Sequence, residues 1–282
     1  MITPDSAKIL HLVKKERHKH NIIVRSYGVI CVVRTTSSDA ILPIQKVLKT
    51  YLPGCEFLRS DAEAEHEFWY SWNKNAGDSL YKPDAVAIRD KRTYLLDTLG
   101  SAVRIAVAEY AVGHVFIHAG VVGWKGKAII IPARSFKGKT ALTAELVRRG
   151  ALYYSDEYAV LDEKARVHPF PKALSLRGIK NDHDQVDHPV EALGGKAGKR
   201  PIPVGMVVIT EYKKGAKWKP EVLNSGPGVM ALIDNTVPIR RDPHFALPIL
   251  SRAGSNAMIV RSKRGEAELA AASILKILEN GK

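Results

Sequence analysis

The sequence contains little cysteine and no long apolar run. Its two cysteines, Cys31 and Cys55, provide neither a disulfide framework nor a metal-site spacing, which favours a reducing compartment. The apolar stretches, such as Val115–Ile117 and Ala128–Ile131, are far shorter than a membrane-spanning helix. The basic N-terminal stretch has no long apolar segment and no small-residue cleavage site, so we expect no secretory signal. These absences predict a cytoplasmic protein with no membrane partner.

The sequence also lacks a single block of positive charge, although its formal net charge is +14. The excess is +3 over residues 1–100, +6 over 101–200 and +5 over 201–282. Only Lys14–His20 and Tyr212–Lys219 are locally dense in basic residues, and no recognised nucleic-acid motif accompanies them. A diffuse positive charge favours anionic ligands such as nucleotides, acidic peptides and RNA. Without a motif, nucleic acid is the least favoured of these partners.

The sequence pattern of residues 1–100 predicts a small α+β module. The β-branched stretch Asn21–Thr35 predicts a strand or hairpin, and Ser37–Gly54 has the apolar spacing and the Pro-Gly end of a helix. We expect a second hairpin over Asp84–Thr98 and a mostly buried helix over Leu99–His114. This module could recognise a partner or mediate oligomerisation, and the sequence does not choose between these roles.

Residues 101–282 predict a second, larger domain with an α/β core. Two strands joined at Gly126 precede a Lys/Ser/Gly-rich loop, and a helix follows that closes at Gly150. The remaining expected elements are two β-rich runs in Ala151–Asp162, an extended Ala165–Gly178, a mobile loop or lid over Ile179–Arg200, strands at Ile202–Tyr212 and Ala257–Val260, and helices at Gly228–Asn235, Pro243–Ala253 and Glu266–Leu278.

The loop between the predicted strand and helix matches three of the four defined positions of the phosphate-loop pattern G-x-x-x-x-G-K-[ST]. The candidate nucleotide-binding residues are Ala133, Arg134, Ser135, Phe136, Lys137, Gly138, Lys139 and Thr140. Gly138 would let backbone amides converge on phosphates, Lys139 would neutralise their charge, and Thr140 could ligate Mg²⁺ at the helix N-terminus. The alternative interpretation is a basic surface turn that only begins a helix.

A phosphoryl-transfer site also needs a carboxylate near the metal and a group that positions the acceptor hydroxyl. Asp156 and Glu157 lie between two short β-rich runs directly after the loop's helix, which would place them on the loop's side of the sheet. Taken alone, they could be a solvated turn. His118 ends an apolar run, where a lone histidine is more often a core residue than a catalytic one.

Taken together, these residues resemble the catalytic domain of HPr kinase/phosphorylase. The match is closer to HPr-kinase-related proteins, whose pattern includes HAGVV, SDEYAVLD and HPFPKALSLR, all present here between Val115 and the C-terminus. The resemblance implies a phosphate-loop kinase core of the type shared with ATP-dependent phosphoenolpyruvate carboxykinase. Some related proteins phosphorylate a hydroxyl of a ribosomally made precursor peptide, as in lasso-peptide pathways. HPr kinases also assemble into rings of subunits, but this sequence has no interface signature that carries the assembly over, so a homo-oligomer stays an open alternative.

The resemblance also implies roles for individual residues. Asp156 would be the general base, and Lys139 with Arg177 would stabilise the charge of the transferred group. Thr140 and Glu157 would hold Mg²⁺, and His118 would lie beside the γ-phosphate of ATP. Ser175 stands where HPr kinase carries a carboxylate, and Phe136 replaces a family glycine. Either the loop has rearranged, or Phe136 points outward and shields the γ-phosphate.

The sequence therefore predicts an ATP- and Mg²⁺-dependent kinase that phosphorylates a hydroxyl, preferably on Ser or Thr of a peptide or protein. Two alternatives remain open. One is a nucleotide-binding regulator or scaffold that has lost transfer, which the altered loop motivates. The other is a small-molecule kinase, which would need a narrow and enclosed acceptor pocket rather than an open groove.

Overall fold

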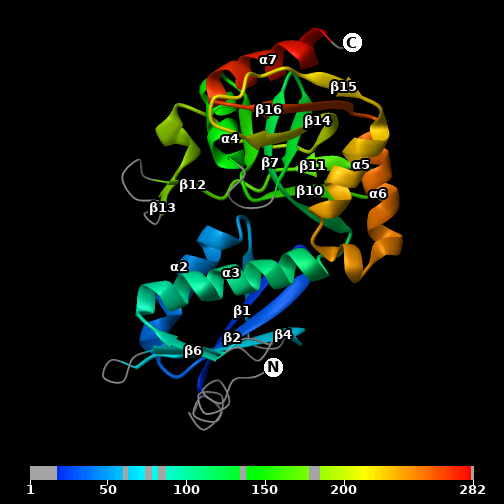
Figure 1. Cartoon of the computed structure of the whole chain (residues 1–282). Helices are drawn as coiled ribbons and strands as arrows, with labels where there is room; N and C mark the ends of the chain where they lie inside the picture. The colour runs from blue at the N-terminus through cyan, green and yellow to red at the C-terminus, as the bar shows by residue number, and fades with distance from the viewer. Residues whose placement is uncertain are drawn as a thin grey trace. The chain divides into compact units, whose positions relative to one another are not determined.

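The computed structural model describes residues 18–59, 63–73, 78–81, 87–133, 138–177 and 185–280. The chain forms two compact units, Met1–Val112 and Gly113–Lys282 (Figure 1). Each unit contains its own sheet and helices, which confirms the mixed α/β class expected from the sequence. None of the helices in the described part of the chain is long and apolar enough to cross a membrane.

The first unit is built on a six-stranded sheet. Its described strands, in spatial order, are β3 (Glu56–Leu58), β1 (His20–Ser26), β2 (Val29–Thr35), β4 (His66–Ser71), β5 (Asp78–Tyr81) and β6 (Ala87–Asp90). The short helix η1 (Ser38–Ala40) leads into α2 (Ile41–Tyr51), which packs beside α3 (Arg92–Tyr110). Strands β1 and β2 form the hairpin predicted from their β-branched residues, with Tyr27 and Gly28 at positive φ in its turn.

The predicted hairpin over Asp84–Thr98 is wrong. Within it, β6 is a strand, but α3 begins at Arg92 and continues to Tyr110. The helix forms because Leu95, Leu99 and Val103 recur every four residues and are all buried on one face. The proposed boundary between residues 100 and 101 falls inside this helix, which belongs to the first unit.

The second unit is built on an eight-stranded sheet. Its strands follow the order β11 (Arg166–His168), β10 (Tyr158–Asp162), β7 (His114–Trp124), β8 (Lys127–Pro132), β14 (Ile202–Tyr212), β16 (Met258–Arg264) and β15 (Glu221–Leu223), with β9 (Leu152–Ser155) also paired to β7. A separate hairpin joins β12 (Leu174–Arg177) to β13 (Gln185–His188). The helices are α4 (Lys139–Arg148), α5 (Ser225–Asp234), α6 (Pro243–Ser255) and α7 (Ala267–Asn280), with short turns η2 (Val190–Leu193) and η3 (Pro238–Arg240).

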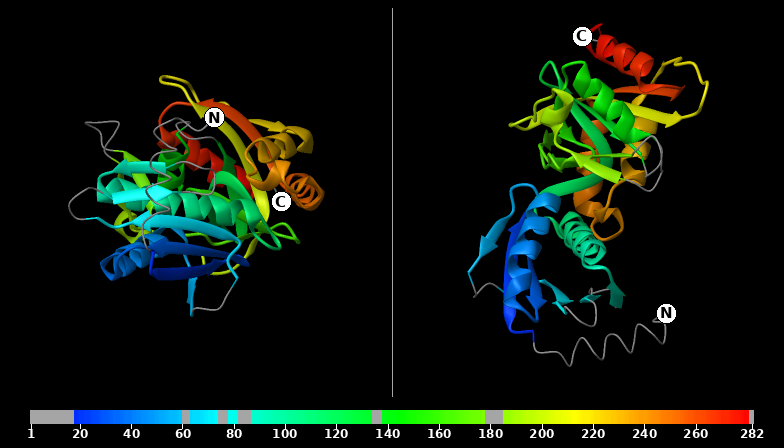
Figure 2. Two further views of the ribbon diagram at one scale, coloured as in Figure 1. Left: turned by 90° about the horizontal axis from the view of Figure 1, so that it is seen from below. Right: turned by 90° about the vertical axis from the view of Figure 1, so that its left-hand side faces the viewer.

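Helices cover both faces of this sheet. Ile129 and Ile131 of β8 pack with α4 and α7, which lie side by side on one face (Figures 1 and 2). Ile130 points to the opposite face, where α5 and α6 cover the core. A strand buried on both faces is continuously apolar rather than alternating, as the run Ala128–Ile131 is.

Three central strands determine where the loop lies. Strands β8, β14 and β16 are parallel, so their carboxyl ends lie at the same edge of the sheet. The segment after β8 leads to α4 at this edge, as the sequence predicts. Strand β7 runs antiparallel to β8, and its first half pairs with β10 while its second half pairs with β9. The turn between β9 and β10 therefore lies beside the middle of β7.

Candidate functional site

The two ends of the predicted phosphate loop are well defined. Strand β8 ends at Pro132, and α4 begins at Lys139 after Gly138, which has φ +80° and serves as the N-cap. A left-handed residue at this point requires glycine, since a side chain there would be strained. Arg134, Ser135, Phe136 and Lys137 lie outside the described residues, so the two conformations considered for Phe136 both remain predictions.

Lys139 is enclosed rather than exposed. Only 8% of this residue is accessible to solvent, because it packs against β7 where Gly120 leaves room for its side chain. A Cβ atom at Gly120 would overlap Oγ1 of Thr143 and lie 2.9 Å from Cγ of Lys139. The strand and helix therefore approach each other at a glycine. This approach holds the Lys139 side chain in place at the start of the helix.

His118 lies beside Lys139. Its Nδ1 is 2.8 Å from the carbonyl oxygen of Ala133 and 3.1 Å from Nζ of Lys139. When Nδ1 carries a proton, it donates to the Ala133 carbonyl; when Nδ1 is unprotonated, it accepts from the Lys139 ammonium. Each tautomer therefore forms only one of these two hydrogen bonds. On the other side of the ring, Nε2 lies 3.6 Å from Oε1 of Glu157. The imidazole thus connects the end of β8, the start of α4 and the acidic turn.

The acidic turn is shaped by Ser155. Its hydroxyl oxygen accepts hydrogen bonds from the backbone N–H groups of Glu157 at 3.0 Å and Tyr158 at 2.9 Å. Such side-chain bonds to the following backbone stabilise a tight turn. The carbonyl of Glu157 accepts from the N–H of Ala119 at 3.2 Å, which fixes the turn against β7. Asp156 is thereby presented next to the first turn of α4.

Asp156 is the most perturbed carboxyl group of this cluster. Its Oδ1 is buried and has no hydrogen-bond partner among the described residues, while Thr140 donates a hydrogen bond to the carboxylate. The pKa of Asp156 is raised to about 6, chiefly by burial and additionally by nearby Glu157, against the opposing effects of Lys139 and the Thr140 bond. A buried carboxylate with a free oxygen and a pKa closer to neutrality is suited to accept a proton.

The structure also brings Lys172 to this cluster, a residue that sequence analysis did not assign. Lys172 is 6% exposed, and its charge lowers the pKa of Asp156. Its backbone carbonyl accepts a hydrogen bond from the buried Tyr153 hydroxyl at 2.5 Å. Lysine side chains are rarely buried without a partner group. In the sequence, the only signal for Lys172 was its place within the Pro-containing stretch HPFPKA.

The predicted role of Arg177 involves a residue whose side chain is not described. Its backbone pairs with Gln185 in the β12–β13 hairpin, and Ser175 pairs with Asp187. Leu174, three residues before Arg177, is buried in the same core cluster as the apolar face of α4. The hairpin therefore begins beside the helix of the loop, and a contact between Arg177 and a transferred group remains a prediction.

No cluster of three or more His, Cys, Asp or Glu side chains that could hold a metal ion occurs within the described ranges. The few oxygen donors present would suit a metal ion that binds together with a nucleotide rather than a closed protein site. Mg²⁺ commonly takes one or two protein oxygens and completes its shell with phosphate and water. The Thr140 hydroxyl and the adjacent carboxylates, with Oδ1 of Asp156 unpartnered, fit such an ion.

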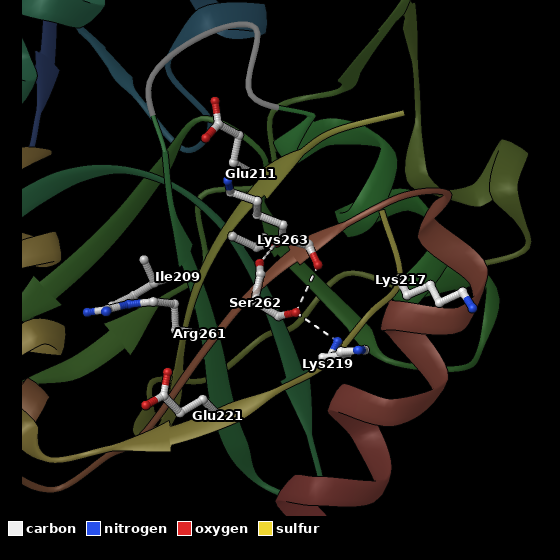
Figure 3. Close-up of a pocket in the computed structure, with 9 residues that line it drawn as sticks. Ile209, Glu211, Lys217, Lys219, Glu221, Arg261, Ser262 and Lys263 are labelled. Carbon is white, nitrogen blue, oxygen red and sulfur yellow. Dashed lines mark hydrogen bonds between the residues drawn. The ribbon is translucent and has the colours of Figure 1, made fainter. Parts of the chain in front are cut away.

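A second feature is a surface cavity of about 490 Å³ over the carboxyl halves of β14 and β16 (Figure 3). Its charged lining includes Lys217, Lys219, Arg261 and Lys263, together with Glu211 and Glu221. Glu221 and Arg261 are register partners on β15 and β16, and Glu211 and Lys263 are partners on β14 and β16. Opposite charges on paired positions of neighbouring strands are typical of a solvated sheet surface. We therefore assign the cavity no catalytic role.

Comparison with known proteins finds distant likeness in structure and none in sequence. No protein-family model matches the sequence, and no curated protein matches it. Among solved structures, the chain is similar to the HPr(Ser) kinase/phosphatase from Coxiella burnetii, with 13% sequence identity and a TM-score of 0.31. The similarity covers 59% of this chain and 95% of that protein. We therefore base the functional proposal on the geometry of the site.

Proposed function

We propose that this protein is an ATP-dependent kinase that transfers the γ-phosphate to a hydroxyl group, preferably of Ser or Thr in a peptide or protein. The observation that carries the proposal is the position of Asp156. Its buried carboxylate, with one unpartnered oxygen, contacts Thr140 in the first turn of a helix that begins with Gly138 and Lys139. A proton acceptor and a phosphate-binding helix N-terminus therefore adjoin each other.

The proposed reaction assigns one role to each group. The acceptor oxygen forms a bond to the γ-phosphorus, the bond from that phosphorus to the β–γ bridging oxygen breaks, and ADP leaves. Asp156 takes the proton of the attacking hydroxyl. Lys139 and Arg177 offset the negative charge of the phosphoryl group, and His118 orients Lys139 beside it. Thr140 and Glu157 would hold Mg²⁺, whose chemistry is to neutralise phosphate charge.

The acceptor is the finer part of the proposal. All of the assigned residues belong to the second unit, which leaves the first unit to bind the acceptor or a second copy of the chain. The net charge of +14 is distributed along the chain and favours an acidic peptide over a neutral or basic one. A ribosomally made precursor peptide with a Ser or Thr hydroxyl is the acceptor class that we propose to test first.

The test has a binding arm and a transfer arm. Calorimetry measures Mg-ATP binding to the wild type and to Lys139→Ala, and ADP release is then followed with hydroxyl-bearing peptides. Asp156→Asn keeps the shape of the side chain but cannot accept the proton, so transfer should fall by about 10²- to 10⁴-fold while ATP binding persists. Asp234→Asn, on the exposed end of α5, is the matched control and should behave as wild type.

Each arm can contradict the proposal separately. Unchanged turnover in Asp156→Asn would remove Asp156 from the role of base. Nucleotide binding without ADP release, over a broad set of acceptors, would instead support a regulator that has lost transfer. Equal ATP affinity in the wild type and Lys139→Ala would show that the loop does not bind phosphate.

A further inference from the structure

A buried arginine lies beside the end of the loop. Arg264 is the last residue of β16 and is 1% exposed. Its Nη2 donates a hydrogen bond to the carbonyl of Gly138 at 2.5 Å, and its Nη1 donates to the carbonyl of Gly265 at 2.8 Å. The guanidinium lies 5.6 Å from the ring centroid of Tyr212, the neighbouring residue on β14. This side chain is therefore fixed against Gly138, the N-cap residue of α4.

The charge of Arg264 is incompletely compensated. Both of its hydrogen-bond acceptors are neutral carbonyl groups, and no carboxylate among the described residues forms an ion pair with it. Its Nε–H is buried and has no hydrogen-bond partner in the described part of the chain. Burial lowers the pKa of Arg264, while Glu266, Tyr212 and Glu268 oppose this effect, and the guanidinium remains charged. A buried cation with an unused donor is costly unless an anion pairs with it.

The start of α4 adds an independent attraction for an anion. The helix has ten residues, its N-cap Gly138 supplies no side-chain cap, and its first N–H groups lie at the Gly138 end. A helix N-terminus carries a partial positive charge that favours phosphate. The guanidinium of Arg264, which carries an unpartnered Nε–H, and the uncapped helix end thus both lie at Gly138.

The strand order decides which part of a nucleotide Arg264 would contact. Strand β8, which leads into the loop, has β7 on one side and β14 followed by β16 on the other. Asp156 belongs to the β7 side, because it follows β9, which pairs with β7. Arg264 ends β16 and so lies on the opposite side of the loop. A nucleotide that presents its γ-phosphate to Asp156, with its other phosphates following the line from β7 across β8 to β14 and β16, would extend towards Arg264.

We propose that Arg264 is a nucleotide-binding residue that contacts a phosphate retained in ADP, not the transferred one. This inference deepens the proposed function, since it rests on a nucleotide occupying the loop. It predicts that Arg264 contributes equally to ADP and ATP affinity and is not specific to the transfer step.

The test is calorimetric binding of Mg-ADP and Mg-ATP to the wild type, Arg264→Met, Arg264→Lys and Arg148→Met. The methionine variant should raise the Kd for both nucleotides by the same factor, about tenfold or more, because a charge-assisted hydrogen bond is lost. The lysine variant retains the charge and should recover part of the affinity. Arg148, exposed near the other end of α4, makes the same change in net charge and should leave both affinities unchanged.

Melting temperatures of the ligand-free variants separate binding from folding. Wild-type nucleotide affinity in Arg264→Met would overturn the inference, as would a failure of the wild type to bind ADP. An equal loss in the lysine and methionine variants, matched by equal falls in melting temperature, would show that Arg264 only holds the loop and would also overturn it. ADP binding needs no transfer, so the result is independent of the Asp156→Asn experiment, which tests the kinase proposal.

Discussion

Gly120→Ala tests the close approach of β7 and α4 on which the site depends. The added methyl group would overlap Oγ1 of Thr143 and lie 2.9 Å from Cγ of Lys139, in a region where both helix and strand are buried. Overpacking of this kind costs about 1–3 kcal/mol, and the smaller unfolded-state entropy of alanine offsets up to about 1 kcal/mol. We therefore expect a net destabilisation of about 1–2 kcal/mol together with weaker Mg-ATP binding, because Lys139 is displaced.

The assay combines chemical denaturation with calorimetric titration of Mg-ATP. Thr143→Ala removes the nearest overlapping atom, a buried hydroxyl with no hydrogen-bond partner among the described residues. The double variant Gly120→Ala/Thr143→Ala should therefore regain much of the lost stability, a coupling that two independent sites would not show. Gly226→Ala is the control, since its Cβ would meet only Oδ1 of Asn224 at an ordinary 3.5 Å. Wild-type stability and affinity in Gly120→Ala would refute the described packing.

Two further predictions concern the charged residues around the site. Lys172→Met keeps the length of a buried side chain but removes a cation that acts on Asp156. The rate of phosphoryl transfer, measured as ADP release, should therefore fall about tenfold or more. The control variant Lys164→Met changes an exposed lysine and should leave this rate unchanged. Burial alone would raise the pKa of Asp162, but hydrogen bonds from Arg166 and His168 lower it to about 2. A depressed carboxyl pKa contributes stability above the unfolded value of about 3.9, so Asp162→Asn should cost about 1–2 kcal/mol at neutral pH after allowance for solvent screening. Thermal unfolding against pH should show this difference vanish as the pH falls from about 4 to 2; a constant difference would contradict the assignment.

Local sequence signals predicted the elements that carry the site. The apolar run Ala128–Ile131 followed by Gly138-Lys139 predicted a strand, a loop and a helix, and this order is confirmed. The acidic pair was expected between two short strands, which β9 and β10 confirm. The predicted strand Ile202–Tyr212 and the three C-terminal helices are confirmed as well, with ends that differ by a few residues. These elements could be predicted because the spacing of apolar residues and the positions of glycines are signals contained within a single segment of the chain.

The residues that the sequence did not identify reach the site through long-range pairing. Arg264 meets Gly138 only because β14 pairs with both β8 and β16, a register that no local pattern specifies. Lys172 is buried, and its backbone carbonyl accepts a hydrogen bond from Tyr153. Because lysine is ordinarily exposed, the residue type alone would place Lys172 on the surface. His118 was expected near the loop, but its position beside the acidic turn depends on the strand register that pairs it with Tyr158. Non-local strand pairing is set by the whole core rather than by the segment itself.

Under the proposed function, the contacts of His118 would affect how tightly a nucleotide is held. With Nδ1 unprotonated, the imidazole is a partner for the Lys139 ammonium, so an incoming phosphate would replace one acceptor of this ammonium by another. In the other tautomer, which carries the proton on Nδ1, the ring donates to the carbonyl of Ala133 instead. The affinity for the nucleotide would then be the free-energy difference between Lys139 bound to phosphate and Lys139 bound to His118. If the protein is the kinase proposed above, return of the His118 contact would assist the departure of the product.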